Sequence, residues 1–239
     1  MKYAIIAAGE GSRLSQEGVN LPKPLVRIHG EAMIDRLIRI FDENGAEEIC
    51  VMVNHIHPQT EAHVRELAAS RKPGQAPIVI EVKTTPSSMH SFYCLAPHLR
   101  GSRFCLTTVD TIFKEEEFSK YIKTFEAAPE DDGLMAVTNF IDDEKPLYVA
   151  TDLELRITGF HDQPEAGDRY ISGGIYALGP RALDTLDRCI AEGKSRMRNF
   201  QRALVADGLK LRAYPFGKVL DVDHADDITK AEEFLDKEI

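Results

Sequence analysis

The sequence contains no tryptophan, only four cysteines, and no uninterrupted apolar stretch of the roughly 20 residues that cross a bilayer. The cysteines, Cys50, Cys94, Cys105 and Cys189, are widely separated and form no Cys-x-x-Cys pair. This spacing indicates neither a zinc knuckle nor a dithiol redox motif, so we expect four reduced, structural thiols. The first apolar run, residues 3–8, is too short for a signal peptide. These absences predict a cytoplasmic protein that has no membrane contact.

Positive charge is also scarce, because 29 Lys and Arg residues stand against 39 Asp and Glu residues and the net charge is −10. Nucleic-acid binding draws its affinity from Lys and Arg side chains that neutralise phosphates, so this balance argues against a nucleic-acid partner. Anionic substrates must instead be met by local cations and metal. The 239 residues, 43% of them hydrophobic, suit one α/β domain, and no repeat or long linker divides them. We therefore expect a single domain over residues 1–239.

Apolar segments and amphipathic helical patterns alternate along the chain. Strands are expected at residues 3–8, 48–53, 78–82, 103–109, 134–140, 148–151, 155–160, 170–178 and 210–214. Helices are expected at residues 32–44, 59–69, 88–99, 118–125, 181–191, 199–206 and 226–236, and acidic loops at 130–133 and 142–146. This alternation predicts an α/β fold, a three-layer, Rossmann-like and mostly parallel sheet with helices on both faces. Ligands are expected at the carboxyl ends of its strands.

The first expected strand leads into a glycine-punctuated loop, Gly-Glu-Gly-Ser-Arg at residues 9–13. Gly9 and Gly11 place no Cβ where backbone N–H groups would approach phosphate oxygens. Arg13 adds a planar fork of donors, and Lys23, within Pro-Lys-Pro-Leu at residues 22–25, adds a compact charge. A glycine loop alone is also common at ordinary turns. Two cations beside such a loop indicate a polyphosphate site.

Two other phosphate-binding loops do not fit this sequence. The dinucleotide fingerprint needs a third glycine where the chain has Leu14, which disfavours a dehydrogenase, and the P-loop needs Gly-Lys-Ser/Thr where Gly11 precedes Ser12 and Arg13. The remaining pattern, Ala-Ala-Gly-x-Gly-Ser-Arg-Leu at residues 7–14 with Pro-Lys-Pro-Leu, resembles the nucleotidyltransferases that make nucleoside-diphosphate sugars, also called sugar-nucleotide pyrophosphorylases. The resemblance is dense over residues 3–38 and recurs to residue 228.

The resemblance implies a GT-A-like fold and a Mg²⁺-assisted in-line displacement. A sugar 1-phosphate oxygen would attack the α-phosphorus of a nucleoside triphosphate, and pyrophosphate would leave. Lys23 and Arg13 would be catalytic, with Lys23 between the phosphates of donor and acceptor. Residues 84–91 occupy the place where the family reads the base, without its Gly-Thr-Ala signature. The nucleotide-binding residues that follow are Ala7, Ala8, Gly9, Gly11, Ser12, Arg13 and Ser88, the last as a base contact.

Two acidic segments are candidates for a magnesium site. Asp110 ends the apolar run at residues 104–109, where a parallel sheet presents its ligand edge, and by resemblance it is a magnesium ligand. The segment Asp-Val-Asp at residues 221–223 is similar to the family's second metal segment. On an extended chain Asp221 and Asp223 point the same way, so either or both could bind the cation, and the next two aspartates are expected to start the final helix. Hard oxygen ligands together with substrate phosphates suit Mg²⁺.

Gly173 and Gly174 lie in a strand-like segment that looks like the family's Gly-Ile-Tyr strand beside the sugar. A glycine pair within a strand marks either a bulge or a close approach of another group to the backbone. By resemblance the approaching group would be the sugar and its phosphate, which makes the two glycines candidate substrate-binding residues.

Asn54 follows the strand expected at residues 48–53, and it could contact a substrate for the same positional reason as Asp110. His55, His57 and His63 come shortly after it. No carboxylate or cysteine stands at metal-ligand spacing from these histidines, so a solvated or substrate-adjacent role is favoured over a zinc site.

Two alternatives to a sugar-phosphate acceptor remain open at this point. The acceptor could be phosphocholine, as in related cytidylyltransferases, if aromatic side chains formed a cage for the quaternary ammonium. The chain could instead be a non-catalytic, nucleotide-binding regulatory module, against which the retention of Arg13, Lys23, Asp110 and Asp221 argues. The sequence identifies neither the base, the sugar nor the oligomeric state.

Overall fold

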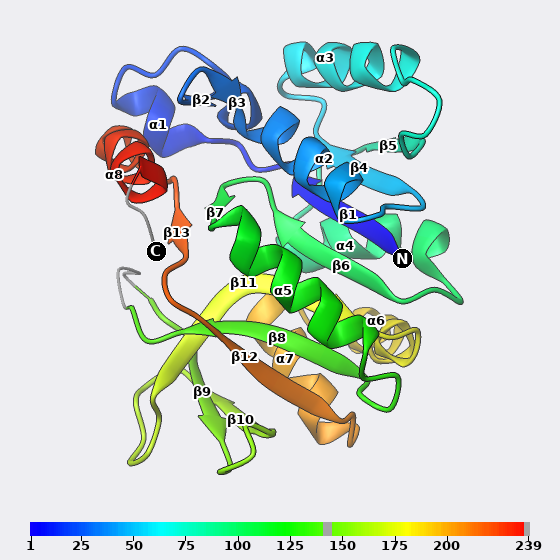
Figure 1. The fold of residues 1–239 in the computed structure, drawn as a ribbon, viewed down its shortest axis with the longest axis vertical. Coiled ribbons are helices and arrows are strands. Elements are labelled where there is room, and N and C mark those ends of the chain that lie inside the picture. The colour runs from blue at the N-terminus through cyan, green and yellow to red at the C-terminus, as the bar shows by residue number, and fades with distance from the viewer. Residues whose placement is uncertain (141–144, 237–239) are drawn as a thin grey trace.

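Within residues 1–140 and 145–236, which the computed structural model describes, a nine-stranded mixed sheet carries helices on both faces (Figure 1). Its strands are β1 (Lys2–Ala7), β4 (Ile49–Val53), β5 (Ile78–Val82), β6 (Phe104–Thr108), β8 (Gly133–Thr138), β9 (Tyr148–Thr151), β10 (Ile157–His161), β11 (Tyr170–Leu178) and β12 (Leu211–Phe216). Their hydrogen-bonded order is β10-β9-β11-β6-β1-β4-β5, with β8 beside β11 and β12 beside β8. The strands β5, β4, β1 and β6 are parallel, and β11 runs antiparallel to β6.

The helices divide between the two faces of this sheet. Buried residues of α2 (Met33–Glu43), α3 (Pro58–Ala69), α5 (Glu115–Glu126) and α8 (Ala225–Asp236) join the core on one face. The core on the other face is built with α4 (Ser88–Leu99), α6 (Arg181–Ala191) and α7 (Met197–Ala206). None of the helices in the described residues has the length and apolarity that a membrane crossing requires.

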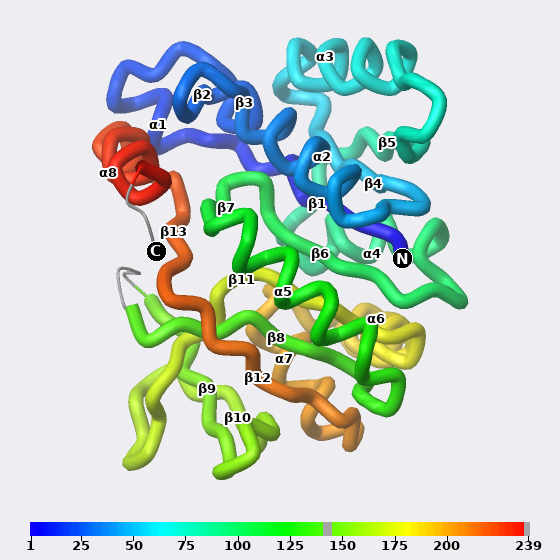
Figure 2. Tube along the Cα trace, in the orientation of Figure 1, coloured from blue at the N-terminus to red at the C-terminus, as the bar shows by residue number. Residues whose placement is uncertain are grey.

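Shorter elements connect these layers. They are α1 (Ser12–Gln16), a 3₁₀ turn at Lys23–Leu25, the hairpin of β2 (Arg27–Ile28) with β3 (Glu31–Ala32), and an antiparallel pair of β7 (Thr111–Ile112) with β13 (Leu220–Asp221). Figure 2 shows β7 and β13 side by side, although more than a hundred residues separate them in the chain. This small pair brings Leu220 and Asp221 to the edge of the sheet where β6 ends.

The first strand illustrates why the sheet is covered on both sides. Side chains alternate along a strand, so Tyr3 and Ile5 enter one core while Ala4 and Ile6 enter the other. A strand that is buried on both faces is apolar throughout, which explains the uninterrupted run at its position.

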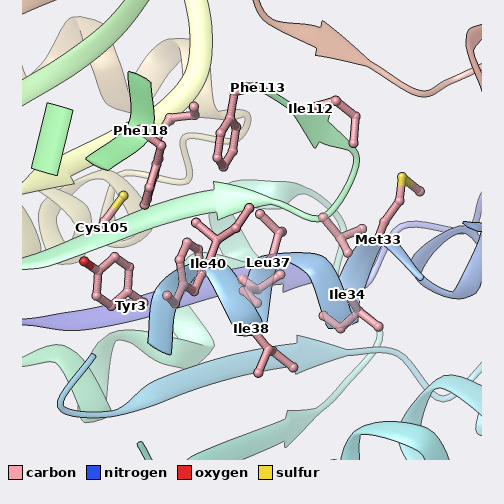
Figure 3. Packing of buried hydrophobic residues seen from close by; sticks show 14 of the residues in the cluster. Tyr3, Met33, Ile34, Leu37, Ile38, Ile40, Cys105, Ile112, Phe113 and Phe118 are labelled. Atoms are coloured by element: carbon pink, nitrogen blue, oxygen red, sulfur yellow. The ribbon is translucent and has the colours of Figure 1, made fainter. Parts of the chain in front are cut away.

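Aromatic stacking consolidates the core between α2, α5 and β1. Tyr3 stacks on Phe41 with ring centroids 4.5 Å apart, and Phe113 stacks on Phe118 at 4.8 Å. Figure 3 shows Leu37 and other apolar side chains of α2 among these rings. The helical spacing of these residues in the sequence therefore corresponds to one buried face of α2.

The predicted α/β fold is confirmed, and several predicted segments coincide with observed elements, namely β5, α4, β9, β11 and α6. Helix α5 begins at Glu115, earlier than predicted, because three glutamates form its first turn, where negative charge is favourable. Strand β12 continues through Pro215, which is tolerated because the other side of β12 carries only the bridge of Arg212 with Arg156 in the described residues, and this bridge lies away from the proline. The acidic loop expected at 142–146 lies largely outside the described residues.

The glycine pair of β11 forms a bulge. Beyond the pair, Ile175 to Leu178 lie against β6, whereas Tyr170 and Ile171 lie against β9, and the register with β8 shifts in between. Gly174 has a φ of +74°, and a Cβ on Gly173 would lie 3.2 Å from the carbonyl oxygen of Ala136. The bulge interpretation of this pair is thus confirmed, and neither position accepts a side chain without strain.

Tyr121 on α5 ties β8 to β11 through its buried hydroxyl, which donates to the carbonyl oxygen of Leu134 (2.6 Å) and accepts from the backbone N–H of Ala177 (2.7 Å). We expect Tyr121→Phe to lower the free energy of unfolding by about 1–3 kcal/mol, because it leaves both buried backbone groups without their hydrogen bond to the hydroxyl. Urea denaturation measures this change. Tyr93→Phe, at a 41% exposed position, is the control and should lose less than about 0.5 kcal/mol. Equal losses would contradict the bridging role.

Candidate functional site

The loops after the parallel strands meet at one edge of the sheet, because parallel strands end on the same side. The loops that follow β1, β5 and β6 surround a cavity of about 420 Å³, called here the first cavity. It is lined by residues 6–13, Lys23, Pro24, 85–88, Ser91, 108–110 and Asp223. The residues predicted to bind a nucleotide all lie in this lining, namely Ala7, Ala8, Gly9, Gly11, Ser12, Arg13 and Ser88.

The glycine loop is shaped differently at its two glycines. Gly11 has a φ of +62°, and a Cβ there would lie 3.1 Å from the Cβ of Lys23, so a glycine lets Lys23 pack against the loop. A Cβ on Gly9 would meet nothing within 4 Å. The backbone N–H groups of Gly9, Glu10 and Gly11 donate to no other group in the described part of the chain. Unpaired amide donors on a cavity wall favour an anionic ligand.

Lys23 links three separate segments at the mouth of this cavity. It lies on the 3₁₀ turn between two buried prolines, and its side chain is 11% exposed. The ammonium forms ion pairs with Asp110 and, at 2.6 Å, with Asp223. Arg13 reaches the other oxygen of Asp223 at 3.1 Å. Burial alone would lower the pKa of Lys23, but Asp110 and Asp223 more than offset it and raise that pKa, so the ammonium stays charged.

Asp221 lies beside Asp110 although it is far away in sequence. It stands opposite Thr111 in the β7–β13 pair, and the N–H of Val222 donates to the carbonyl oxygen of Asp110 at 3.1 Å. Asp221 is exposed on the wall of a pocket, yet nearby protein groups partly desolvate its carboxylate. This desolvation, together with the negative charge of Asp110, raises the pKa of Asp221 to about 7, against a weaker opposite effect of Lys23.

A second cavity, of about 540 Å³, adjoins the first and shares Arg13 and Asp223 with it. It is lined by Arg13, Thr138, Phe140, Lys145, 171–173, 219–221, Asp223, His224, Asp226, Asp227 and Lys230. Of the two predicted substrate-binding glycines, Gly173 lines this cavity. Gly174 does not, and a Cβ there would face Thr111 at 3.4 Å. Most of this lining was missed by sequence reasoning, because Thr138, Phe140 and Lys145 belong to no motif.

The aspartates of this site could hold a hard divalent cation only together with further ligands, such as substrate phosphates. No group of three or more His, Cys, Asp or Glu side chains in the described residues is arranged to hold a metal by itself. Both oxygens of Asp223 are engaged, one by Lys23 and one by Arg13, whereas no cation is paired with Asp221 within 4 Å in the described part of the chain. Asp110 and Asp221 are therefore the better pair of oxygen ligands for Mg²⁺, which accepts one or two carboxylates beside substrate phosphates.

The remaining polar predictions resolve into structural roles. Asp227 accepts hydrogen bonds from the N–H groups of Asp223 and His224 and so helps to start α8, as expected. Asn54 lines neither cavity and is only 2% exposed, so the structure favours a structural role over the predicted substrate contact. His63 pairs with Asp35 at 2.5 Å.

Comparisons with known proteins agree with this geometry. A family model described as the MobA-like NTP transferase domain matches residues 3–205. The chain is 27% identical, over 97% of its length, to 51% of a bifunctional IPC transferase and DIPP synthase of Rubrobacter xylanophilus. It is 28% identical, over 78% of its length, to 52% of a mannose-1-phosphate guanyltransferase of Schizosaccharomyces pombe. The chain thus spans about half the length of these curated relatives.

A solved structure shares the fold. The inositol-1-phosphate CTP transferase from T. maritima superimposes with a TM-score of 0.79 at 19% identity, covering 98% of this chain and 94% of that one.

The raised pKa of Asp221 gives a stability test. Because its folded-state pKa of about 7 exceeds the value of about 4 in an unfolded chain, its ionisation costs stability as the pH rises through this window. In metal-free protein we expect Asp221→Asn to raise the free energy of unfolding at about pH 8, on the order of 1 kcal/mol because solvent screens the site, and to do so less at about pH 5. Urea denaturation with a chelator measures both values. A difference that stays constant with pH would contradict this assignment.

Proposed function

The chain belongs to the family of MobA-like NTP transferase domains, and we propose that it is a cytoplasmic enzyme that transfers a nucleoside monophosphate from a nucleoside triphosphate to a phosphorylated polyol such as a sugar 1-phosphate, with release of pyrophosphate. One observation carries the proposal. Lys23 lines the first cavity beside the glycine loop, whose amide donors are unpaired in the described part of the chain. It forms ion pairs with Asp110 and with Asp223, and Asp223 lines both cavities.

The triphosphate belongs in the first cavity in this proposal. The N–H groups of Gly9, Glu10 and Gly11 would bind its phosphate oxygens, and Arg13 would add a planar pair of donors. Ser88, at the first turn of α4, would lie beside the base. The volume of about 420 Å³ is within the range of small-molecule sites.

The acceptor belongs in the second cavity, whose lining is polar and charged. Phe140 is the one aromatic residue among its described lining residues, and Lys218 already lies over that ring, 4.2 Å from its centroid. A cage for a quaternary ammonium needs several free aromatic faces, so phosphocholine is disfavoured. Side chains such as Asp226 and Lys230 offer hydrogen bonds to hydroxyl groups instead. The names of curated relatives, which include a mannose-1-phosphate guanyltransferase and a glucose-1-phosphate cytidylyltransferase, support a polyol phosphate.

The reaction is a single in-line displacement. A phosphate oxygen of the acceptor is already an anion and attacks the α-phosphorus without a general base, so catalysis consists of positioning and charge neutralisation. Lys23, which lines the first cavity and pairs with the shared Asp223, would offset the repulsion between donor and acceptor phosphates. Asp110 and Asp221 would hold Mg²⁺, which supplies stabilisation of charge at the α-phosphate. A non-catalytic module is disfavoured because Arg13, Lys23 and Asp110 line the first cavity and Asp221 lines the adjoining one.

The proposal is tested by measuring pyrophosphate release with Mg²⁺. The common ribonucleoside triphosphates and dTTP are each combined with a panel of sugar 1-phosphates, inositol 1-phosphate and phosphocholine. We expect release that requires one triphosphate and one polyol phosphate together. Release with phosphocholine alone would contradict the assigned acceptor class, and nucleotide binding without release on any acceptor would contradict the assigned reaction.

Lys23→Ala tests the central residue. We expect kcat to fall by about 10²–10³-fold, because a charge aimed at the reacting phosphates is lost. Circular dichroism should show that the fold persists. Lys72→Ala, an exposed lysine between α3 and β5, is the matched control and should keep full activity. Normal turnover by Lys23→Ala would refute its assigned role.

A further inference from the structure

We propose that Asn54, with His57, is a positioning residue that aims the backbone N–H groups of the glycine loop into the first cavity. The inference rests on the proposed function, since it assumes that this cavity takes a triphosphate. The side-chain amide of Asn54 is buried and lines neither cavity, so its role would be indirect.

Every hydrogen-bonding position of the Asn54 side chain is occupied. Its Nδ2 donates to the carbonyl oxygens of Ala8 (2.9 Å) and Gly9 (3.1 Å), and its Oδ1 accepts from the N–H groups of Ile56 (2.9 Å) and His57 (3.0 Å). A primary amide has two donor hydrogens and two acceptor lone pairs, so none is left for a substrate. Because carbonyls only accept and backbone N–H groups only donate, these partners also fix which way the amide points.

His57 adds a third contact to the same loop. Its Nε2 lies 2.9 Å from the carbonyl oxygen of Glu10, so Nε2 carries the hydrogen in this contact. Three consecutive carbonyls, those of Ala8, Gly9 and Glu10, are therefore drawn toward the turn between β4 and α3.

The geometry of the peptide group links the direction of these carbonyls to the direction of the neighbouring N–H groups. In a trans peptide the C=O and the N–H point in opposite directions, and the described chain contains no cis bond. The N–H groups of Gly9, Glu10 and Gly11 must then point away from Asn54 and His57. These three residues line the first cavity, and their N–H groups donate to no other group in the parts of the chain described.

The loop needs such a restraint because its own residues supply little. Gly9 has no side chain, and a Cβ there would meet no atom within 4 Å, so no side chain at this position restricts the loop's conformation. A rotated peptide would present a carbonyl oxygen, rather than an N–H, to an anionic ligand. The bonds from Asn54 and His57 oppose that rotation at each successive peptide.

Asn54→Asp tests the proposal, since it keeps the shape of the side chain and replaces both donor hydrogens by an oxygen that faces two carbonyls. We expect the dissociation constant for inorganic tripolyphosphate with Mg²⁺ to rise by about tenfold or more, and kcat/KM for pyrophosphate release to fall by about 10²-fold, as for a misplaced binding group. The KM for the acceptor should stay unchanged. The matched control is Asn44→Asp, which removes a bond of 2.8 Å to the carbonyl of Ile40 at the end of α2 and should leave all three values unchanged.

A second pair of variants keeps the test decisive if Asn54→Asp does not fold. His57→Leu removes the donor to Glu10 and should weaken tripolyphosphate binding several-fold. His57→Gln retains an N–H donor and should restore much of it. A role in stability alone would lower the melting temperature of His57→Leu without this difference in affinity.

These measurements distinguish a failure of the proposed function from a failure of the positioning role of Asn54. Wild-type protein that binds neither tripolyphosphate nor any nucleoside triphosphate overturns the proposed function and this inference with it. Wild-type protein that turns over substrate, while folded Asn54→Asp or His57→Leu binds tripolyphosphate equally well, overturns the positioning role alone.

Discussion

The parallel pairing of β1 with β4 and β6 is the constraint on which the site depends. It places consecutive strand ends along one edge, so that each following loop delivers a different chemical group to the same place. The loop after β1 delivers amide donors, the loop after β4 a buried side-chain amide, and the loop after β6 the carboxylate of Asp110. No single loop forms a site by itself, and a shift in strand register would separate all of them.

Electrostatics then joins segments that the sheet alone does not bring together. In a chain of net charge −10, Lys23 and Arg13 lie where Asp110, Asp221 and Asp223 come together. In the unliganded protein Lys23 neutralises Asp110 and Asp223, whereas in the proposed reaction the same ammonium must face phosphates. A divalent cation taken up at Asp110 would compete with Lys23 for that carboxylate. In the proposed function, metal uptake would therefore be coupled to the release of Lys23 toward phosphate.

The sequence was sufficient for the long elements and for the first cavity, because both depend on local signals. Apolar runs and helical spacing locate β1, β5, α4 and α6, and the glycine loop is a contiguous motif. The proximity of Asp221 to Asp110 depends on β7 and β13, which are two residues long each and carry no periodicity. Asn54 was placed at the correct edge, but its direction is fixed by the glycine loop across from it, which a linear pattern does not encode.

The bulge at Gly173 and Gly174 has a consequence for how this architecture diversifies. Because β11 leaves β6 there and pairs with β9, the β9–β10 hairpin makes no strand pairing with β5, β4, β1 or β6 in the described residues. It is attached through β11 and through the bridge between Arg156 and Arg212 of β12. Insertions or exchanges in that hairpin would not disturb the register of β5, β4, β1 and β6. The hairpin can therefore vary during evolution while the parallel strands, and the first cavity at their carboxyl ends, are preserved.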